Sequence, residues 1–244
     1  MESFPILGWK HLSPREHMAL RVKHFDHCSE CLGIRYSASG ERCKCLDAYN
    51  NEYEQICANL PAKYIGLEFN DIKDNDFVAK NNETFKIIKN YISDLKNMKQ
   101  TGAGIYFWGE SGAGKSYLAS RILKKALKQG YSAYFVSLEN LVRANFKSRS
   151  EPKYDEYLET LERDIDFLVI DEIDKMPNDS KPSLSFFETF LKNRYHSKKC
   201  LITTANSSRE DMHLNGDNIG LRGVLADLMD APIIGNHRGI DENI

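Results

Sequence analysis

The stretch that most constrains this chain is the octapeptide Gly109-Glu110-Ser111-Gly112-Ala113-Gly114-Lys115-Ser116. Its glycines let successive backbone N–H groups curve around an anion, and its lysine adds a positive charge, so the pattern predicts a phosphate-binding loop. Such a loop needs a buried strand before it and a helix after it. Residues 105–108 are an apolar run, and apolar residues recur at every fourth position from Leu118 to Ala126, so the sequence predicts both elements.

The chemistry of this loop assigns roles to its residues. All of residues 109–116 are expected to surround the phosphates of a nucleotide. Lys115 is expected to reach the β- and γ-phosphates, and the hydroxyl of Ser116 is expected to bind Mg²⁺.

Further buried strands are predicted at residues 133–136 and 167–170, and the latter strand ends in Asp171 and Glu172. Because the carboxyl ends of parallel strands meet at one edge of a sheet, both carboxylates should face the phosphate-binding loop. We expect Asp171 to hold Mg²⁺ together with Ser116, and Glu172 to act as the general base for the attacking water. The pair favours ATP hydrolysis over phosphate transfer by a small-molecule kinase, which does not need the added base.

Three more polar residues are candidates for the same site. Asn206 follows a strand predicted at residues 201–204, where its side chain could orient water beside the γ-phosphate; a turn-forming asparagine is the alternative. Arg222 lies in a short amphipathic helix predicted at residues 220–229, and is the candidate for an arginine finger supplied to a neighbouring subunit. Arg238 is the candidate nucleotide sensor. Ordinary surface arginines are the alternative for both.

Five of the six cysteines precede residue 60. Cys28 and Cys31 form a C-x-x-C pair, and Cys43 and Cys45 form a C-x-C pair, with eleven residues between Cys31 and Cys43. Two such pairs can bring four thiolates to one tetrahedral Zn²⁺, and an all-sulfur site with no open position indicates a structural metal. Reduced, buried cysteines are the alternative. The other candidate ligands are His11, His17, His24, His27 and Cys57.

The remaining sequence outlines the domains. We expect a zinc-binding domain and linker at residues 1–75 and an ATPase domain at residues 76–244. The net charge is −2, so any surface for nucleic acid must be local. A long helical stretch predicted at residues 138–164 carries Arg143 and Lys147 among aromatic residues, a combination that can follow single-stranded DNA; a solvated helix face is the alternative.

Membrane insertion is not predicted, because no apolar run approaches the roughly 20 residues that a membrane helix needs. The N-terminal residues do not have the basic-then-apolar pattern of a secretory leader. We therefore expect a cytoplasmic protein.

The phosphate-binding loop, residues 168–174 and residues 202–206 together resemble the AAA+ ATPases of the DnaC/DnaI helicase-loader group, part of the IstB/DnaC-like ATP-binding family. The cysteine-rich N-terminus is similar to the zinc-binding domain of some loaders. The resemblance implies an α/β fold of the P-loop NTPase class: a five-stranded parallel sheet flanked by helices, with a short lid, preceded by a small zinc-binding domain.

The resemblance also implies a function. ATP, Mg²⁺ and Zn²⁺ are the implied cofactors, and ATP binding would drive assembly into a homo-oligomeric ring or spiral. Arg143 and Lys147 would grip single-stranded DNA inside this spiral, and the N-terminal domain would dock on a replicative helicase. The ATPase subunits of insertion-sequence transposons share the same motifs, so a transposition helper acting with a transposase on duplex DNA is the alternative. The cysteine pairs argue against that alternative, because the DNA-binding module of such helpers is normally helical.

Overall fold

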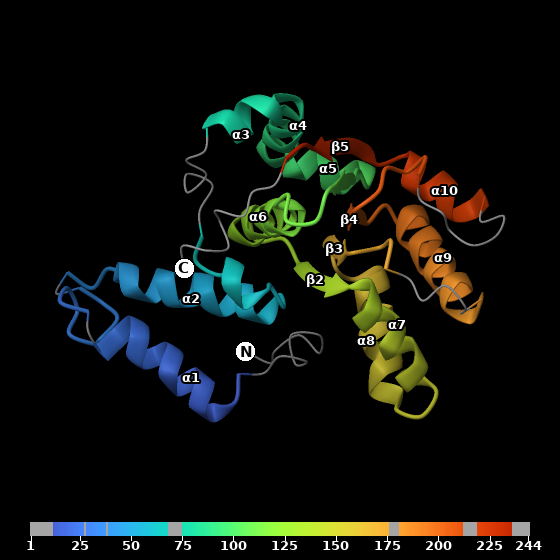
Figure 1. Ribbon diagram of the computed structural model, residues 1–244. Helices are drawn as coiled ribbons and strands as arrows, with labels where there is room; N and C mark the ends of the chain where they lie inside the picture. Colours follow the sequence, from blue (N-terminus) through green and yellow to red (C-terminus); the bar gives the residue numbers. More distant parts are fainter. Residues whose placement is uncertain are drawn as a thin grey trace. The chain divides into compact units, whose positions relative to one another are not determined.

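A computed structural model describes residues 12–26, 28–37, 39–67, 75–175, 181–211 and 219–235. The chain divides into two compact units, residues 1–66 and residues 67–244 (Figure 1). Within the described ranges, we find no helix that is both long enough and apolar enough to cross a membrane.

The first unit contains two helices that flank the cysteine pairs. Helix α1 (Pro14–Arg21) begins with a capping box, in which Ser13 and Glu16 satisfy each other's backbone N–H groups. A π-helical turn, Val22–Asp26, leads to the first cysteine pair, and α2 (Lys44–Cys57) begins at the second. A 3₁₀ turn, Ala62–Tyr64, follows.

The second unit is built on a parallel sheet, whose interior strands are almost fully buried because both faces are covered by helices. The sheet has five strands in the order β2-β3-β4-β1-β5. This architecture confirms the α/β class and the five-stranded parallel sheet expected from the sequence. The strands are β1 (Ile105–Gly109), β2 (Ala133–Ser137), β3 (Phe167–Asp171), β4 (Cys200–Ala205) and β5 (Met229–Ile233).

Right-handed crossovers decide which helices cover which face. Across the sheet, the chain moves from β1 to the edge strand β2. It then returns in the opposite direction through β3 and β4 to the other edge strand, β5. Helix α6 therefore lies on one face of the sheet, and the helices α7 to α10 lie on the opposite face (Figure 1). These helices are α6 (Lys115–Lys128), α7 (Leu138–Ser148), α8 (Pro152–Arg163), α9 (Lys181–His196) and α10 (Ile219–Ala226). Ahead of β1 come α3 (Asn75–Lys80), α4 (Asn82–Ser93) and α5 (Leu95–Thr101), with α4 packed against α6 and β5.

Two element predictions are wrong at their boundaries. The single helix predicted at residues 138–164 is two helices, because Pro152 can occupy the first turn of α8 but not the interior of a longer helix. Met229 does not end the helix predicted at residues 220–229 but begins β5, which lies at the edge of the sheet. An edge strand tolerates Pro232, since its outer side has no partner strand.

Candidate active site

The phosphate-binding loop connects the end of β1 to the start of α6. Gly109 has φ +146°, and a Cβ there would lie 2.2 Å from the backbone oxygen of Ile233 in β5, so no larger residue fits. Gly114 adopts a left-handed conformation, φ +87°, at the N-cap of α6. The first N–H groups of a helix have no partner within the helix, so this turn presents donors that suit a phosphate.

Lys115 is the first residue of α6, and it is only 8% exposed. Its Nζ donates to the backbone oxygens of Gly109 at 2.8 Å and Glu110 at 2.7 Å, and to Oδ1 of Asn206 at 3.1 Å. Burial lowers the pKa of Lys115, an effect that the nearby carboxylates, Asp174 first among them, oppose. The ammonium thus connects the loop to the end of β4.

Ser116 and Asp171 provide a pair of oxygens beside the loop. The hydroxyl of Ser116 donates to Oδ1 of Asp171 at 2.7 Å, and the hydroxyl of Thr204 donates to the same oxygen at 2.6 Å. Burial raises the pKa of Asp171, and these two hydrogen bonds offset the rise only in part. Hydroxyl and carboxylate oxygens are ligands that Mg²⁺ prefers, so the donor set fits the expected ion.

Glu172 follows β3 in a left-handed backbone conformation, with φ +58°. This conformation costs a non-glycine residue about 1–3 kcal/mol and persists only where the surroundings hold it. Thr204 holds it here: its Oγ1 accepts the N–H of Glu172 at 2.9 Å, and its backbone oxygen accepts the N–H of Ile173 at 2.9 Å. The exposed carboxylate of Glu172 lies 2.6 Å from Nζ of Lys175.

Asn206 follows β4, so the loop, Asp171, Glu172 and Asn206 all lie at the carboxyl edge of the sheet, as the sequence predicted. The backbone N–H of Asn206 donates to Oδ2 of Asp174 at 2.9 Å, which fixes the start of the loop after β4. Arg222 belongs to α10, and Arg238 lies outside the described residues.

Thr204 and Asp174 were not among the residues predicted from the sequence. Thr204 contacts Asp171 and Glu172, and Asp174 contacts Asn206. A signal for Thr204 was present: Thr203 and Thr204 are two polar residues in a strand that is otherwise apolar and buried. Asp174 is the last residue of the stretch 168–174 that carries the family resemblance, but the sequence assigned it no role in the site.

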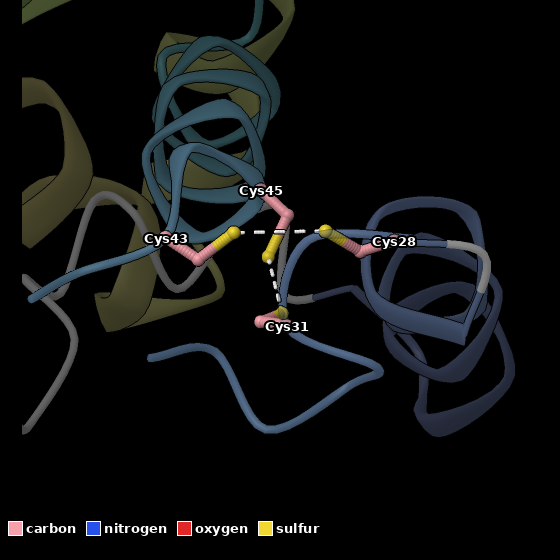
Figure 2. Close-up of side chains that lie close together, drawn as sticks. All are labelled: Cys28, Cys31, Cys43 and Cys45. Carbon is pink, nitrogen blue, oxygen red and sulfur yellow. Dashed lines mark hydrogen bonds between the residues drawn. The ribbon is translucent and has the colours of Figure 1, made fainter. Parts of the chain in front are cut away.

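The four cysteines of the predicted zinc site come together in the first unit (Figure 2). Cys28 Sγ lies 3.6 Å from Cys43 Sγ, and Cys31 Sγ lies 3.4 Å from Cys45 Sγ; all four sulfurs lie within 4.8 Å of one another. A tetrahedron with Zn–S bonds of about 2.3 Å has edges of about 3.8 Å, so the cluster fits Zn²⁺. Burial alone would raise the pKa of Cys31, but the N–H of Arg35 and the neighbouring thiols lower it to about 7.

The alternative zinc ligands are engaged elsewhere or lie outside the described residues. His17 Nε2 is 2.6 Å from the hydroxyl of Tyr49, and His24 Nε2 is 2.8 Å from Oε2 of Glu52. Cys57, at the end of α2, is not part of the thiol cluster. The other two candidates, His11 and His27, fall outside the described ranges.

The basic residues predicted to contact DNA lie on α7, which is exposed along one side. Arg143 pairs with Glu139 at 2.6 Å, and Lys147 donates to the hydroxyl of Tyr154 at 3.1 Å. Phe146 is 44% exposed, which is unusual for so large an apolar side chain. The structure thus places positive charge and aromatic rings together on α7 and the start of α8.

Curated relatives match parts of the chain. The chain is 35% identical over 104 residues to the insertion sequence IS232 putative ATP-binding protein of Bacillus thuringiensis subsp. berliner, a match that covers 41% of this chain and 39% of the relative. It is 28% identical over 141 residues to the chromosomal replication initiator protein DnaA of Onion yellows phytoplasma, covering 56% of this chain and 27% of that protein. The chain therefore spans well under two thirds of these relatives.

Solved structures share the fold. DnaI superposes with a TM-score of 0.61 at 18% identity, covering 71% of this chain and 94% of DnaI. The DnaC helicase loader superposes with a TM-score of 0.56 at 22% identity, covering 63% of this chain and 89% of the loader chain. A replication initiator DnaA bound to AMPPCP and single-stranded DNA superposes with a TM-score of 0.59 at 16% identity, covering 72% of this chain and 51% of the DnaA chain. The second unit therefore has the AAA+ P-loop fold expected from the sequence.

Residues 58–229 match the family described as IstB-like ATP binding protein. The matched range contains the phosphate-binding loop, Asp171, Glu172 and Asn206. The match covers most of the chain, and the four cysteines of the thiol cluster lie outside it. This protein therefore belongs to the IstB-like ATP-binding family.

Proposed function

We propose that this protein binds Mg·ATP at the carboxyl edge of its sheet and hydrolyses it. The observation that carries the proposal is the convergence of Lys115, Asp171 and Asn206, which come from the ends of three different strands or their loops. Three groups from distant parts of the chain meet where the chemistry of a nucleoside triphosphate needs a cation, a magnesium ligand and a polar sensor.

Each residue has a role in this proposal. The loop N–H groups and Lys115 balance the charge of the phosphates, and Ser116 and Asp171 hold Mg²⁺, which would stabilise charge on the phosphate oxygens. Glu172 accepts a proton from the attacking water, and Asn206 orients that water. Arg222 is the proposed finger toward a neighbouring subunit, and Arg238 the proposed nucleotide sensor.

A pair of variants tests the hydrolysis. We expect Glu172→Gln to bind ATP with nearly unchanged affinity but to hydrolyse it at least about 100-fold more slowly, because the amide cannot accept the proton. Lys115→Ala should lose binding as well. Glu159→Gln is the matched control, since it makes the same change at an exposed position of α8. Hydrolysis by Glu172→Gln at the wild-type rate would show that the base is misassigned.

The proposed biological role is to load a replicative hexameric helicase on single-stranded DNA in the cytoplasm. Three features support it: the AAA+ fold shared with DnaI and the DnaC helicase loader, the cysteine cluster in the first unit, and the basic and aromatic surface of α7. In this proposal the first unit binds Zn²⁺ as a structural metal and docks on the helicase. ATP binding drives assembly of a ring or spiral around the DNA, and hydrolysis releases it.

A transposition helper is the second candidate function. The observation that favours it is the 35% identity over 104 residues to the insertion sequence IS232 putative ATP-binding protein. Such a protein would act with a transposase on duplex DNA, using the same ATP site.

A pull-down in the presence of ATP separates the two functions. The full chain carrying Glu172→Gln is used as bait, because slow hydrolysis should prolong the ATP-bound state, and Lys115→Ala is the nucleotide-free control. Recovery of a hexameric helicase with the first bait alone supports the loader. Recovery of a transposase instead would replace the loader with the transposition helper.

A further inference from the structure

The hydroxyl of Thr204 has only one possible arrangement of its hydrogen bonds. Thr204 lies in β4 and is fully buried. Its Oγ1 is 2.9 Å from the backbone nitrogen of Glu172 and 2.6 Å from Oδ1 of Asp171. A backbone N–H can only donate and an ionised carboxylate can only accept, so the hydroxyl accepts from Glu172 and donates to Asp171.

Thr204 also contacts the next residue of the turn. Its backbone oxygen accepts the N–H of Ile173 at 2.9 Å. Two consecutive N–H groups of the turn after β3 are thus bound by one residue of the neighbouring strand. Glu172 needs this support, because φ +58° is sparsely populated by residues other than glycine. The conformation of this turn decides where the carboxylate of Glu172 points.

The adjacent residue provides a natural comparison. Thr203 is also fully buried in β4, but its Oγ1 has no hydrogen-bond partner among the described residues. Successive side chains of a strand point to opposite faces of the sheet, so the hydroxyls of Thr203 and Thr204 face different surroundings. Two threonines of one strand, with equal burial, thus differ in their contacts with the turn after β3.

We propose that Thr204 is a positioning residue for ATP hydrolysis: its hydroxyl holds the backbone of Glu172 in the turn that aims the general base and links that turn to Asp171. The inference rests on the proposed function, since it requires Glu172 to be the base. Thr204 itself touches neither nucleotide nor water in this role. It acts through the backbone of Glu172.

The test compares Thr204→Val with Thr203→Val. Both variants replace a fully buried threonine by a residue of the same shape, but only Thr204→Val leaves the N–H of Glu172 without its acceptor. We expect kcat to fall about 10- to 100-fold in Thr204→Val, with the dissociation constant for ATP changed less than about threefold, because displacing a catalytic group by about 1 Å has an effect of this size. Thr203→Val should keep the wild-type kcat, and Thr204→Ser should restore most of it.

A double-mutant cycle with Glu172→Gln separates positioning of the base from a general effect on the fold. If Thr204 acts through Glu172, then Thr204→Val should slow the wild type but not the Glu172→Gln variant. Equal slowing in both backgrounds, or equal kcat for Thr204→Val and Thr203→Val, would overturn the inference while leaving the proposed hydrolysis intact. Wild-type hydrolysis by Glu172→Gln would instead refute both the base and its positioning.

Discussion

The ammonium of Lys115 donates to Oδ1 of Asn206 across 3.1 Å, although the two residues are 91 positions apart in the chain. Lys115 begins the helix after β1, and Asn206 follows β4, the strand that pairs directly with β1. The pairing of two strands thus brings the phosphate-binding lysine and the proposed sensor into direct contact.

This contact predicts different effects for its two members. Lys115→Ala should weaken ATP binding at least about 100-fold, since the charge that faces the phosphates is lost. Asn206→Ala should leave binding within about threefold of wild type and lower kcat about 10-fold or more, since the proposed sensor acts on the attacking water. Fluorescent-nucleotide titration and steady-state hydrolysis measure the two quantities, with Lys125→Ala on α6 as the control. Equal losses of affinity in both variants would contradict the division of roles.

The cysteine cluster predicts one zinc ion per chain. Cys43→Ser should lose the ion and the helical structure of the first unit, because a structural zinc site contributes directly to folding. Cys57→Ala should retain the ion, since this thiol lies outside the cluster. Metal analysis and circular dichroism are the measurements. Zinc content should also fall as the pH decreases, because protons compete with the metal for the thiolates; full zinc occupancy in Cys43→Ser would rule out this ligand set.

The surface of α7 predicts a change in the salt dependence of DNA binding. If Arg143 and Lys147 each contact a phosphate, the double alanine variant should bind single-stranded DNA more weakly, and the slope of log K against log salt should decrease by about 1.4, or about 0.7 per contact. Lys86→Ala with Lys89→Ala removes the same charge from the exposed side of α4 and is the control. An equal change of slope in the control pair would mean that only net charge matters.

Asp166 predicts a pH-dependent contribution to stability. Its carboxylate lies 2.8 Å from Nζ of Lys99 and 3.3 Å from Nζ of Lys199. Burial would raise the pKa of Asp166, but these two ammonium groups lower it. The folded state therefore binds this proton less tightly than the unfolded chain, so the stabilisation is complete at neutral pH and disappears as the pH falls below the ordinary aspartate pKa, about 3.9.

Asp166→Asn should accordingly reduce the free energy of unfolding by about 1 kcal/mol at pH 7, a modest amount because Lys99 is partly exposed. The difference from wild type should shrink toward zero between about pH 4 and pH 3. Denaturant unfolding at several pH values measures it, with Glu159→Gln as a control. A difference that stays constant across this range would show that the ion pairs are not its cause.

The sequence by itself determined the parts of the site that depend on local chemistry. The glycines and Lys115 are adjacent in the chain, and Asp171 and Glu172 directly follow a buried strand, so their proximity to the nucleotide follows from the general geometry of parallel sheets. The thiol cluster was also predictable from the sequence, because the close spacing of the cysteines limits how far apart the four thiols can lie. Four of the five strands were also predicted from the sequence.

Only the tertiary structure decided the remaining features, because they depend on which strands lie side by side. Edge strand β5 contains Pro232 and has no apolar run, so its residues did not indicate a strand until its pairing with β1 was known. Thr204 is distant in sequence from Glu172, and its hydroxyl becomes part of the site through the pairing of β3 with β4. Local pattern predicts which residues can perform the chemistry, whereas long-range strand pairing fixes which side chains hold them in place.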